Sequence, residues 1–162
     1  MNYADQLKTC LEREAALVVE FIAALDAEAE ALLDRKAYEA LHLATQRKEA
    51  LTEKLVQLSQ QRDALLLTLG VATGHAGTDA AAAMHPELAP IWELLQVHAQ
   101  QAREKNSRNG TLIEINLRST TESLEALRAL GGANSTTYDA QGRGKRAGYG
   151  PTTGSARSIV AT

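Results

Sequence analysis

Apolar residues recur in steps of three and four along one unusually long segment of the sequence, from Leu88 to Leu127. This spacing indicates one face of an α-helix, and at about 1.5 Å per residue a helix of that length measures about 60 Å. Such a helix predicts a bundle of long helices. Polar residues interrupt the stripe near its middle. The full stripe consists of Leu88, Ile91, Trp92, Leu95, Ala99, Ala102, Asn106, Asn109, Ile113, Leu117, Thr120, Leu124 and Leu127.

The first predicted helix covers residues 4–33. Its apolar residues also follow steps of three and four, and one series repeats every seven residues, which approaches the heptad seam of a coiled coil. Acidic residues are expected to fill the other faces of this helix. The heptad series is Leu11, Val18, Leu25 and Leu32, and the acids are Glu12, Glu14, Glu20, Glu28 and Glu30.

The second predicted helix covers residues 36–69, after a short break at Asp34. The Asp34 carboxylate can accept from the first backbone N–H groups of this helix, which predicts an N-cap; one continuous helix through Asp34 is the alternative. Helices joined by so short a break are expected to lie antiparallel. Lys48 and Arg62 lie on the apolar stripe, where their stems can cover the seam while their charges reach water. The heptad series here is Ala44, Leu51, Leu58 and Leu65.

Gly70 is expected to end the second helix by adopting the left-handed conformation. Residues 70–86 contain three glycines and are predicted to form a loop, with one short helical turn near 80–84. The third predicted helix covers residues 87–130, because Pro86 and Pro90 suit its first turn. The first two helices are shorter, so part of the third is expected to extend beyond them or bend back.

Residues 131–162 have a different composition. They contain seven of the eleven glycines, no leucine and no periodic apolar pattern, so they cannot bury enough surface to offset the entropy of ordering. They are predicted to be a flexible, disordered tail. Four basic residues and one acid give this tail a formal charge of +3, against −6 for the rest of the chain. A solvated tail is the simplest interpretation; an acidic protein surface, nucleic acid or anionic lipid is the alternative partner.

The whole sequence predicts an all-α fold: an elongated antiparallel three-helix bundle of coiled-coil character, with a long third helix and a disordered C-terminal tail. Its 162 residues suit one domain, 1–130, followed by the tail 131–162. Aromatic residues make up only 4%, so leucine and alanine must fill the core, as in long helices. The single cysteine, Cys10, excludes an internal disulfide. The sequence lacks a signal peptide and a long apolar span, so we expect a cytoplasmic protein.

Several patterns that can carry chemistry are incomplete in this sequence. Glu39 and His42 have the Glu-x-x-His spacing of di-iron bundles, but a second copy is missing. The segment Gly142 to Lys145 lacks the spacing and the preceding strand of a phosphate-binding loop, and the tail has no repeated module for RNA. Cys10 is interpreted as a small apolar filler beside the seam. We therefore expect no catalysis, no metal, no cofactor and no nucleic-acid partner.

The polar interruption of the third helix has two interpretations. A buried asparagine can fix the register of paired helices at some cost in stability, which suits Asn106 and Asn109. Alternatively, the region is loosely packed so that a helix of another protein docks there, and Gly110 contributes by weakening the helix by about 1 kcal/mol relative to alanine. The sequence leaves both interpretations open.

Two motifs in order point to a family. The segment N-x-x-N-G-x-L-I runs from Asn106 to Ile113 and precedes a leucine-bearing helix, and T-x-Y-x-x-x-G runs from Thr136 to Gly142 in the basic, glycine-rich tail. Together they resemble the FlgN family of flagellar export chaperones. The tail beyond Gly142 is glycine-rich and basic as in that family, but Tyr149 and Pro151 match nothing in the family pattern, so the role of residues 143–162 stays open.

The resemblance implies a cytoplasmic, non-enzymatic chaperone. Such a protein binds hook-associated proteins, which join hook to filament, prevents their premature assembly and delivers them to the cytoplasmic platform of the flagellar type III export gate. The family pattern implies that the C-terminal region binds the client and that Tyr138 docks to the gate. A generic coiled-coil scaffold or homo-oligomer is the alternative. The client-binding residues expected here are Asn106, Asn109, Gly110, Leu112, Ile113, Leu117, Leu124 and Leu127.

Overall fold

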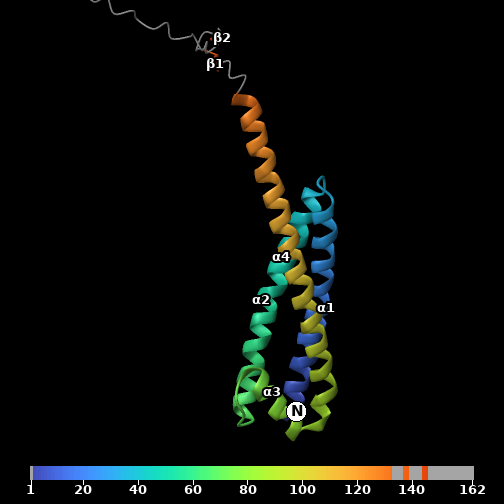
Figure 1. Cartoon of the computed structure of the whole chain (residues 1–162). Helices are drawn as coiled ribbons and strands as arrows, with labels where there is room; N and C mark the ends of the chain where they lie inside the picture. The colour runs from blue at the N-terminus through green and yellow to red at the C-terminus, as the bar shows by residue number, and fades with distance from the viewer. Residues whose placement is uncertain (1, 133–136, 139–143, 146–162) are drawn as a thin grey trace, which may run out of the picture. The chain divides into compact units, whose positions relative to one another are not determined.

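The structure, a computed structural model, describes residues 2–132, 137–138 and 144–145 (Figure 1). The described residues have an all-α fold, as predicted, together with two strands of two residues each. The chain divides into two compact units, Met1–Leu117 and Arg118–Thr162. The elements are α1 (Tyr3–Leu33), α2 (Tyr38–Thr68), α3 (Gly74–Met84), the 3-10 helix η1 (Pro86–Leu88), α4 (Ala89–Gly132), β1 (Thr137–Tyr138) and β2 (Gly144–Lys145).

Side-chain caps and a short turn define the ends of α1. Asn2 is its N-cap: the Asn2 Oδ1 accepts from the Asp5 N–H at 2.8 Å, and the Asp5 carboxylate accepts from the Asn2 N–H at 3.3 Å. This reciprocal pair satisfies two N–H groups that the helix leaves unpaired. Asp34 is the C-cap of α1, and its carboxylate accepts from the Lys36 N–H at 2.9 Å. The prediction that Asp34 is the N-cap of the second helix is therefore wrong, because this carboxylate closes the turn between the helices.

The segment after α2 contains more helix than the sequence predicted. Gly70 does end α2 with a φ of 79°, and its N–H donates to the Leu67 carbonyl. A second left-handed glycine, Gly74 with a φ of 73°, then begins α3. The Gly74 N–H donates to the Asp63 carboxylate at 2.9 Å, which ties the start of α3 to α2. The predicted loop with one helical turn is wrong, since the glycines here begin a helix instead of preventing one.

Helices α1 and α2 lie side by side with opposite chain directions (Figure 1). Two ion pairs with a buried carboxylate join them: the Arg62 guanidinium binds the Glu14 carboxylate at 2.7 Å, and the Lys48 ammonium binds the Glu28 carboxylate at 2.7 Å. A third, exposed pair joins Arg47 to Glu20 at 3.9 Å. The acids of the first two pairs are fourteen residues apart on α1 and their bases fourteen apart on α2, in reverse order. Ion pairs spaced by two heptads on both helices therefore fix the antiparallel register.

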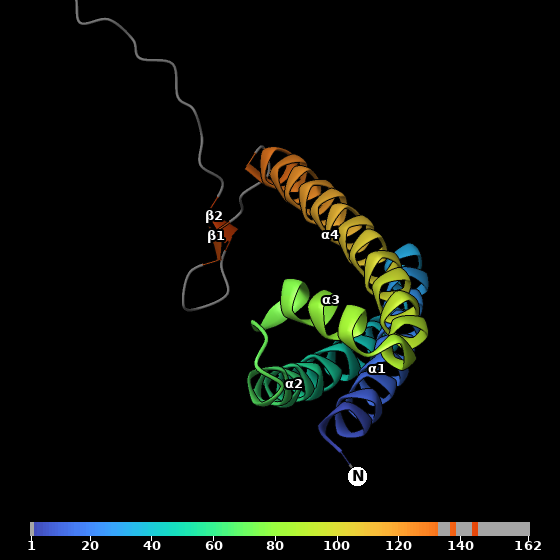
Figure 2. The same ribbon diagram turned by 90° about the horizontal axis from the view of Figure 1, so that it is seen from below.

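Helix α4 runs parallel to α1 in the first unit (Figures 1 and 2). The Asn109 side chain donates to the Leu25 carbonyl at 2.9 Å, and the Asn116 side chain donates to the Leu32 carbonyl at 3.1 Å. Both bonds join residues 84 positions apart. Because both helices advance by seven residues between the two bonds, this offset is the register of a parallel helix pair.

The core of the first unit is a single cluster drawn from all its helices. Three of its members belong to the heptad series of α1, and Leu95 and Ala102 are also seven residues apart on α4. The register of 84 sets Leu11 against Leu95 and Val18 against Ala102. Close packing of such side chains is the main source of stability in a bundle of helices. The cluster consists of Leu7, Leu11, Ala15, Val18, Leu25, Leu66, Ala81, Leu88, Trp92, Leu95 and Ala102.

The second unit contains the remaining part of α4, residues 118–132, and the two short strands. Strands β1 and β2 pair antiparallel, with Thr137 opposite Lys145 and Tyr138 opposite Gly144. The predicted disorder of the tail falls mostly on residues outside the described part of the chain. The predicted division at residue 130 therefore stays a prediction.

Candidate functional site

Two parallel rows of seam residues run along α4, and their burial diverges along the helix. In one row, Leu95, Ala102 and Asn109 are all buried, and Leu88 of η1, seven residues before Leu95, is buried as well. In the other, Trp92 is only 7% exposed, Ala99 is half-buried, Asn106 is exposed and Ile113 is 37% exposed. From Asn106 onward the second row is exposed, whereas Asn109 and Asn116 of the first row still donate hydrogen bonds to carbonyls of α1. The apolar face of α4 therefore opens to solvent within the segment that the sequence singled out.

Asn109 lies at the centre of a buried polar layer. Its side chain is 1% exposed, and its amide donates to the Glu28 carboxylate at 2.9 Å as well as to the Leu25 carbonyl. Glu28 is also 1% exposed and pairs with Lys48. Three helices thus meet at one chain of polar contacts, in which each buried group has a partner. This geometry supports register control as the role of Asn109, because its amide is not accessible to another protein.

A second buried ion pair lies two heptads away between α1 and α2. Both Glu14 oxygens accept from one Arg62 nitrogen, at 2.7 and 2.8 Å. Burial raises the pKa of the Glu14 carboxyl, and the Arg62 charge only partly opposes this. The expectation that Glu14 and Glu28 lie on outer faces is wrong, because both are buried. The expectation that the Arg62 charge reaches water is also wrong, because its side chain is only 12% exposed and binds Glu14, whereas the Lys48 side chain is 22% exposed. The matched fourteen-residue spacings were the available sequence signal.

Asn106 and Gly110 do not share the environment of Asn109. Asn106 is exposed, and a Cβ placed on Gly110 would meet open space. The expectation that Asn106 occupies a buried seam position is therefore wrong, because the row to which it belongs has already left the interface. Helix α4 continues through Gly110 without a break.

The predicted client-contacting residues of α4 are largely exposed in both units. In the first unit, Leu112 is half-buried, Ile113 is 37% exposed and Leu117 is 64% exposed. In the second unit, Leu124 is 49% and Leu127 64% exposed. Exposed leucines at helical spacing are unusual enough to mark an interaction surface when several occur together. Their role in binding stays a prediction.

A polar contact that sequence reasoning missed holds α3 against α4. The Trp92 indole N–H donates to the Asp79 carboxylate at 2.6 Å, and the His75 ring lies 5.0 Å from the Trp92 ring. The His75 Nε2 is 3.3 Å from the same carboxylate. His75 and Asp79 form an i, i+4 pair, which was hidden because the segment was read as a loop. This cluster of His75, Asp79 and Trp92 ties α3 to the first turns of α4. It does not include the exposed residues of α4 after Asn109.

Two of the remaining candidate motifs lie on α1 and α2. Glu39 and His42 are exposed on α2, and the described residues contain no group of three His, Cys, Asp or Glu side chains suited to a metal ion. Cys10 is buried, and its thiol lies 3.6 Å from the Leu58 carbonyl. Burial, and then the Glu14 charge, raise the pKa of this thiol. Among the helices that the structure describes, we find no segment with the length and hydropathy of a transmembrane helix.

The segment Gly142 to Lys145 lies only partly in the described chain, since Gly144 and Lys145 form β2 and the other two residues fall outside it. Tyr138 belongs to β1 through its backbone. The contacts of its side chain lie outside the described structure, so its predicted docking role stays a prediction.

A bundle of long helices with an exposed apolar helix face defines the class of helical binding proteins, in which grooves and faces take up helices of a partner. A model of the FlgN protein family matches residues 1–146. The chain belongs to this family, whose members are flagellar export chaperones and not enzymes. Neither a curated protein nor a solved structure shows significant similarity to the chain.

Proposed function

We propose that this chaperone binds hook-associated flagellar proteins in the cytoplasm, prevents their premature assembly and delivers them to the flagellar export gate. Family membership supports a flagellar export chaperone in general. The observation that carries the finer proposal is the exposure of apolar side chains on α4 beyond Asn109. Leu117 and Leu127 are each 64% exposed, although burying a leucine is worth about 2 kcal/mol.

The spacing of these residues suits an amphipathic helix as the client segment. Ile113, Leu117, Leu124 and Leu127 are separated by four, seven and three residues, so they belong to one helical stripe. Two helices that each carry such a stripe can pack together through ridges and grooves. A surface made of a few leucines binds reversibly, which export requires, because the client must leave the chaperone at the gate.

Asn109 has a separate role in this proposal. Its bonds to α1 and to Glu28 fix where α4 lies along the bundle. Within the first unit, the side chains of Leu112, Ile113 and Leu117 are then presented at a defined rotation around the helix axis. Asn109 is thus a positioning residue, and the client contacts are assigned to Leu112, Ile113, Leu117, Leu124 and Leu127.

Matched variants of α4 test the client surface. Ile115 is 56% exposed but lies two positions from Ile113 and Leu117, off their stripe. We expect Leu117→Ser and Leu124→Ser each to weaken binding to purified hook-associated proteins about tenfold, and Ile115→Ser to leave it nearly unchanged. Isothermal titration calorimetry measures all four affinities on the full chain.

The outcomes separate the parts of the proposal. If the wild-type chain binds no hook-associated protein, the client assignment is wrong; a stable homodimer that buries the α4 leucines would then favour a coiled-coil scaffold. If Ile115→Ser weakens binding as much as Leu117→Ser, the client occupies another face of α4.

Docking to the export gate is tested apart from client binding. Tyr138→Ala should leave client affinity unchanged and lower the amount of client secreted by flagellated cells. A chain that ends at Leu130 should behave in the same way, because it keeps the α4 stripe. Normal secretion with Tyr138→Ala would remove this residue from the mechanism.

A further inference from the structure

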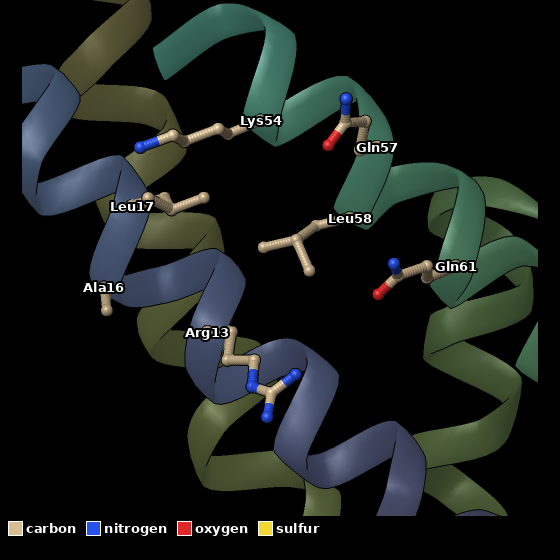
Figure 3. A pocket seen from close by; sticks show the side chains of 7 residues that line it. All are labelled: Arg13, Ala16, Leu17, Lys54, Gln57, Leu58 and Gln61. Carbon is tan, nitrogen blue, oxygen red and sulfur yellow. The ribbon is translucent and has the colours of Figure 1, made fainter. Parts of the chain in front are cut away.

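A groove runs between α1 and α2, away from the residues assigned to the client (Figure 3). It encloses about 400 Å³ and is open to solvent. Leu17 and Leu58 are half-buried at its centre, where the Leu58 side chain points across the groove toward α1 (Figure 3). The remaining lining residues are Arg13, Ala16, Lys54, Gln57 and Gln61.

The two charged residues that line this groove, Arg13 and Lys54, are both basic. Arg13 and Lys54 are exposed at opposite ends of it, with the leucines between them (Figure 3). None of the seven lining residues is acidic. Neither cation forms an ion pair within the described part of the chain. This contrasts with Lys48 and Arg62 on α2, which both bind carboxylates of α1.

We propose that the α1–α2 groove is a second docking surface, which takes an amphipathic α-helix that carries acidic residues, supplied by another protein. The apolar centre matches the apolar face of such a helix, because two antiparallel helices leave a groove in which a further helix can pack along their axes. The two cations match carboxylates on its flanks. The amides of Gln57 and Gln61 can donate further hydrogen bonds to the same acids.

The positions of the cations define the spacing of the acids. Lys54 and Gln61 lie on one side of α2, seven residues apart, which is about 10.5 Å along the helix axis. Arg13 lies at the Gln61 end of the groove (Figure 3). Two acids about two helical turns apart on the occupant would therefore reach Arg13 and Lys54 together.

The chain's own C-terminal segment does not suit this groove. Residues 131–162 carry a formal charge of +3, so their charge has the same sign as the groove. The surface is also independent of the client site, because none of its lining residues lies on α4.

Labelled peptides on the full-length protein test the proposal. The first probe is an amphipathic peptide of about 20 residues with leucines on one face and two glutamates two helical turns apart; the second has glutamine in place of both glutamates. We expect the glutamate peptide to bind about fivefold more tightly at low ionic strength, and the difference to vanish in high salt. Fluorescence anisotropy gives the affinities, and amide chemical shifts give the footprint.

Paired charge variants supply the control. Arg13→Gln with Lys54→Gln should abolish the preference for the glutamate peptide. Lys36→Gln with Arg103→Gln removes the same number of charges from exposed positions outside the groove and should retain it. Leu117→Ser should bind both peptides like the wild type. The groove proposal can therefore fail while the client-site proposal holds, and the reverse.

Three results would overturn the proposal. One is equal affinity for the two peptides, and another is a footprint on α4 in place of residues 13–17 and 54–61. The third is a dimer in sedimentation equilibrium that Leu58→Ser dissociates, because a second copy of the chain would then occupy the groove.

Discussion

Replacing Asn109 by alanine removes the contacts that join α4 to the buried polar layer. The lost bonds are one to the Leu25 carbonyl and one to the Glu28 carboxylate, both at 2.9 Å. A neutral hydrogen bond contributes about 1 kcal/mol and one to a buried charge about 2 kcal/mol. Asn109→Ala should therefore lower the free energy of unfolding by about 3 kcal/mol. Glu28 keeps Lys48 as its partner, which prevents a larger loss.

Equilibrium unfolding in urea, followed by helical circular dichroism, measures this change. With an m-value of about 2 kcal/mol/M, the midpoint should fall by about 1.5 M. Asn106→Ala is the matched control, because Asn106 lies three residues away on α4 and is exposed. It should change stability by less than about 0.5 kcal/mol. Equal losses of stability from the two substitutions would refute the proposal that the buried hydrogen bonds of Asn109 stabilise the bundle.

Two further predictions concern other buried positions. Because burial raises the pKa of Glu14 above its ordinary value of 4.5, the native state binds the proton more tightly than the unfolded state, so this group's contribution to stability is present at low pH and is lost as the pH rises through the native pKa. The unfolding free energy of wild type minus that of Glu14→Gln should therefore be level below about pH 4.5 and decline above it; a rise with pH in denaturation curves would contradict the shift. Gly77→Ala would place a Cβ onto the Ala72 backbone oxygen and should destabilise the protein by about 2 kcal/mol or more, whereas Gly110→Ala, with open space around it, should stabilise α4 by about 1 kcal/mol. Thermal unfolding of the two variants compares them directly, and equal melting temperatures would refute the close contact at Gly77.

The periodicity of the sequence was sufficient to predict the long helices and the all-α class. Heptads such as Leu11, Val18 and Leu25 are visible without a structure because packing against a neighbouring helix demands them. The same rule also indicated the polar interruption on α4. It could not distinguish Asn106 from Asn109, because both fit steps of three and four. In the structure, Asn106 is exposed and Asn109 is buried. This difference depends on where the neighbouring helices lie, which the sequence of α4 alone does not give.

The segment 70–86 shows why local residue types misled the prediction. Glycine weakens a helix by about 1 kcal/mol, so Gly74 and Gly77 favoured a loop. In the structure, tertiary contacts outweigh this cost: Asp63 holds the first N–H of α3, and the close approach of the Ala72 backbone requires the absence of a side chain at Gly77. The buried acids Glu14 and Glu28 were missed for a related reason. A single helix gives no sign of which bases lie opposite, although the equal spacings on α1 and α2 held that information.

The parallel register of α1 and α4 has a consequence for how the chaperone's dimensions are set. With an offset of 84 residues, the last residue of α1, Leu33, corresponds to Leu117, which is also the last residue of the first compact unit. The length of α1 therefore sets how far along α4 this register extends. Residues of α4 after Leu117 have no counterpart on α1 at this offset, because α1 ends at Leu33. The extent of helix left to meet other proteins is then encoded by where α1 stops, at Asp34, as much as by the residues of α4 themselves.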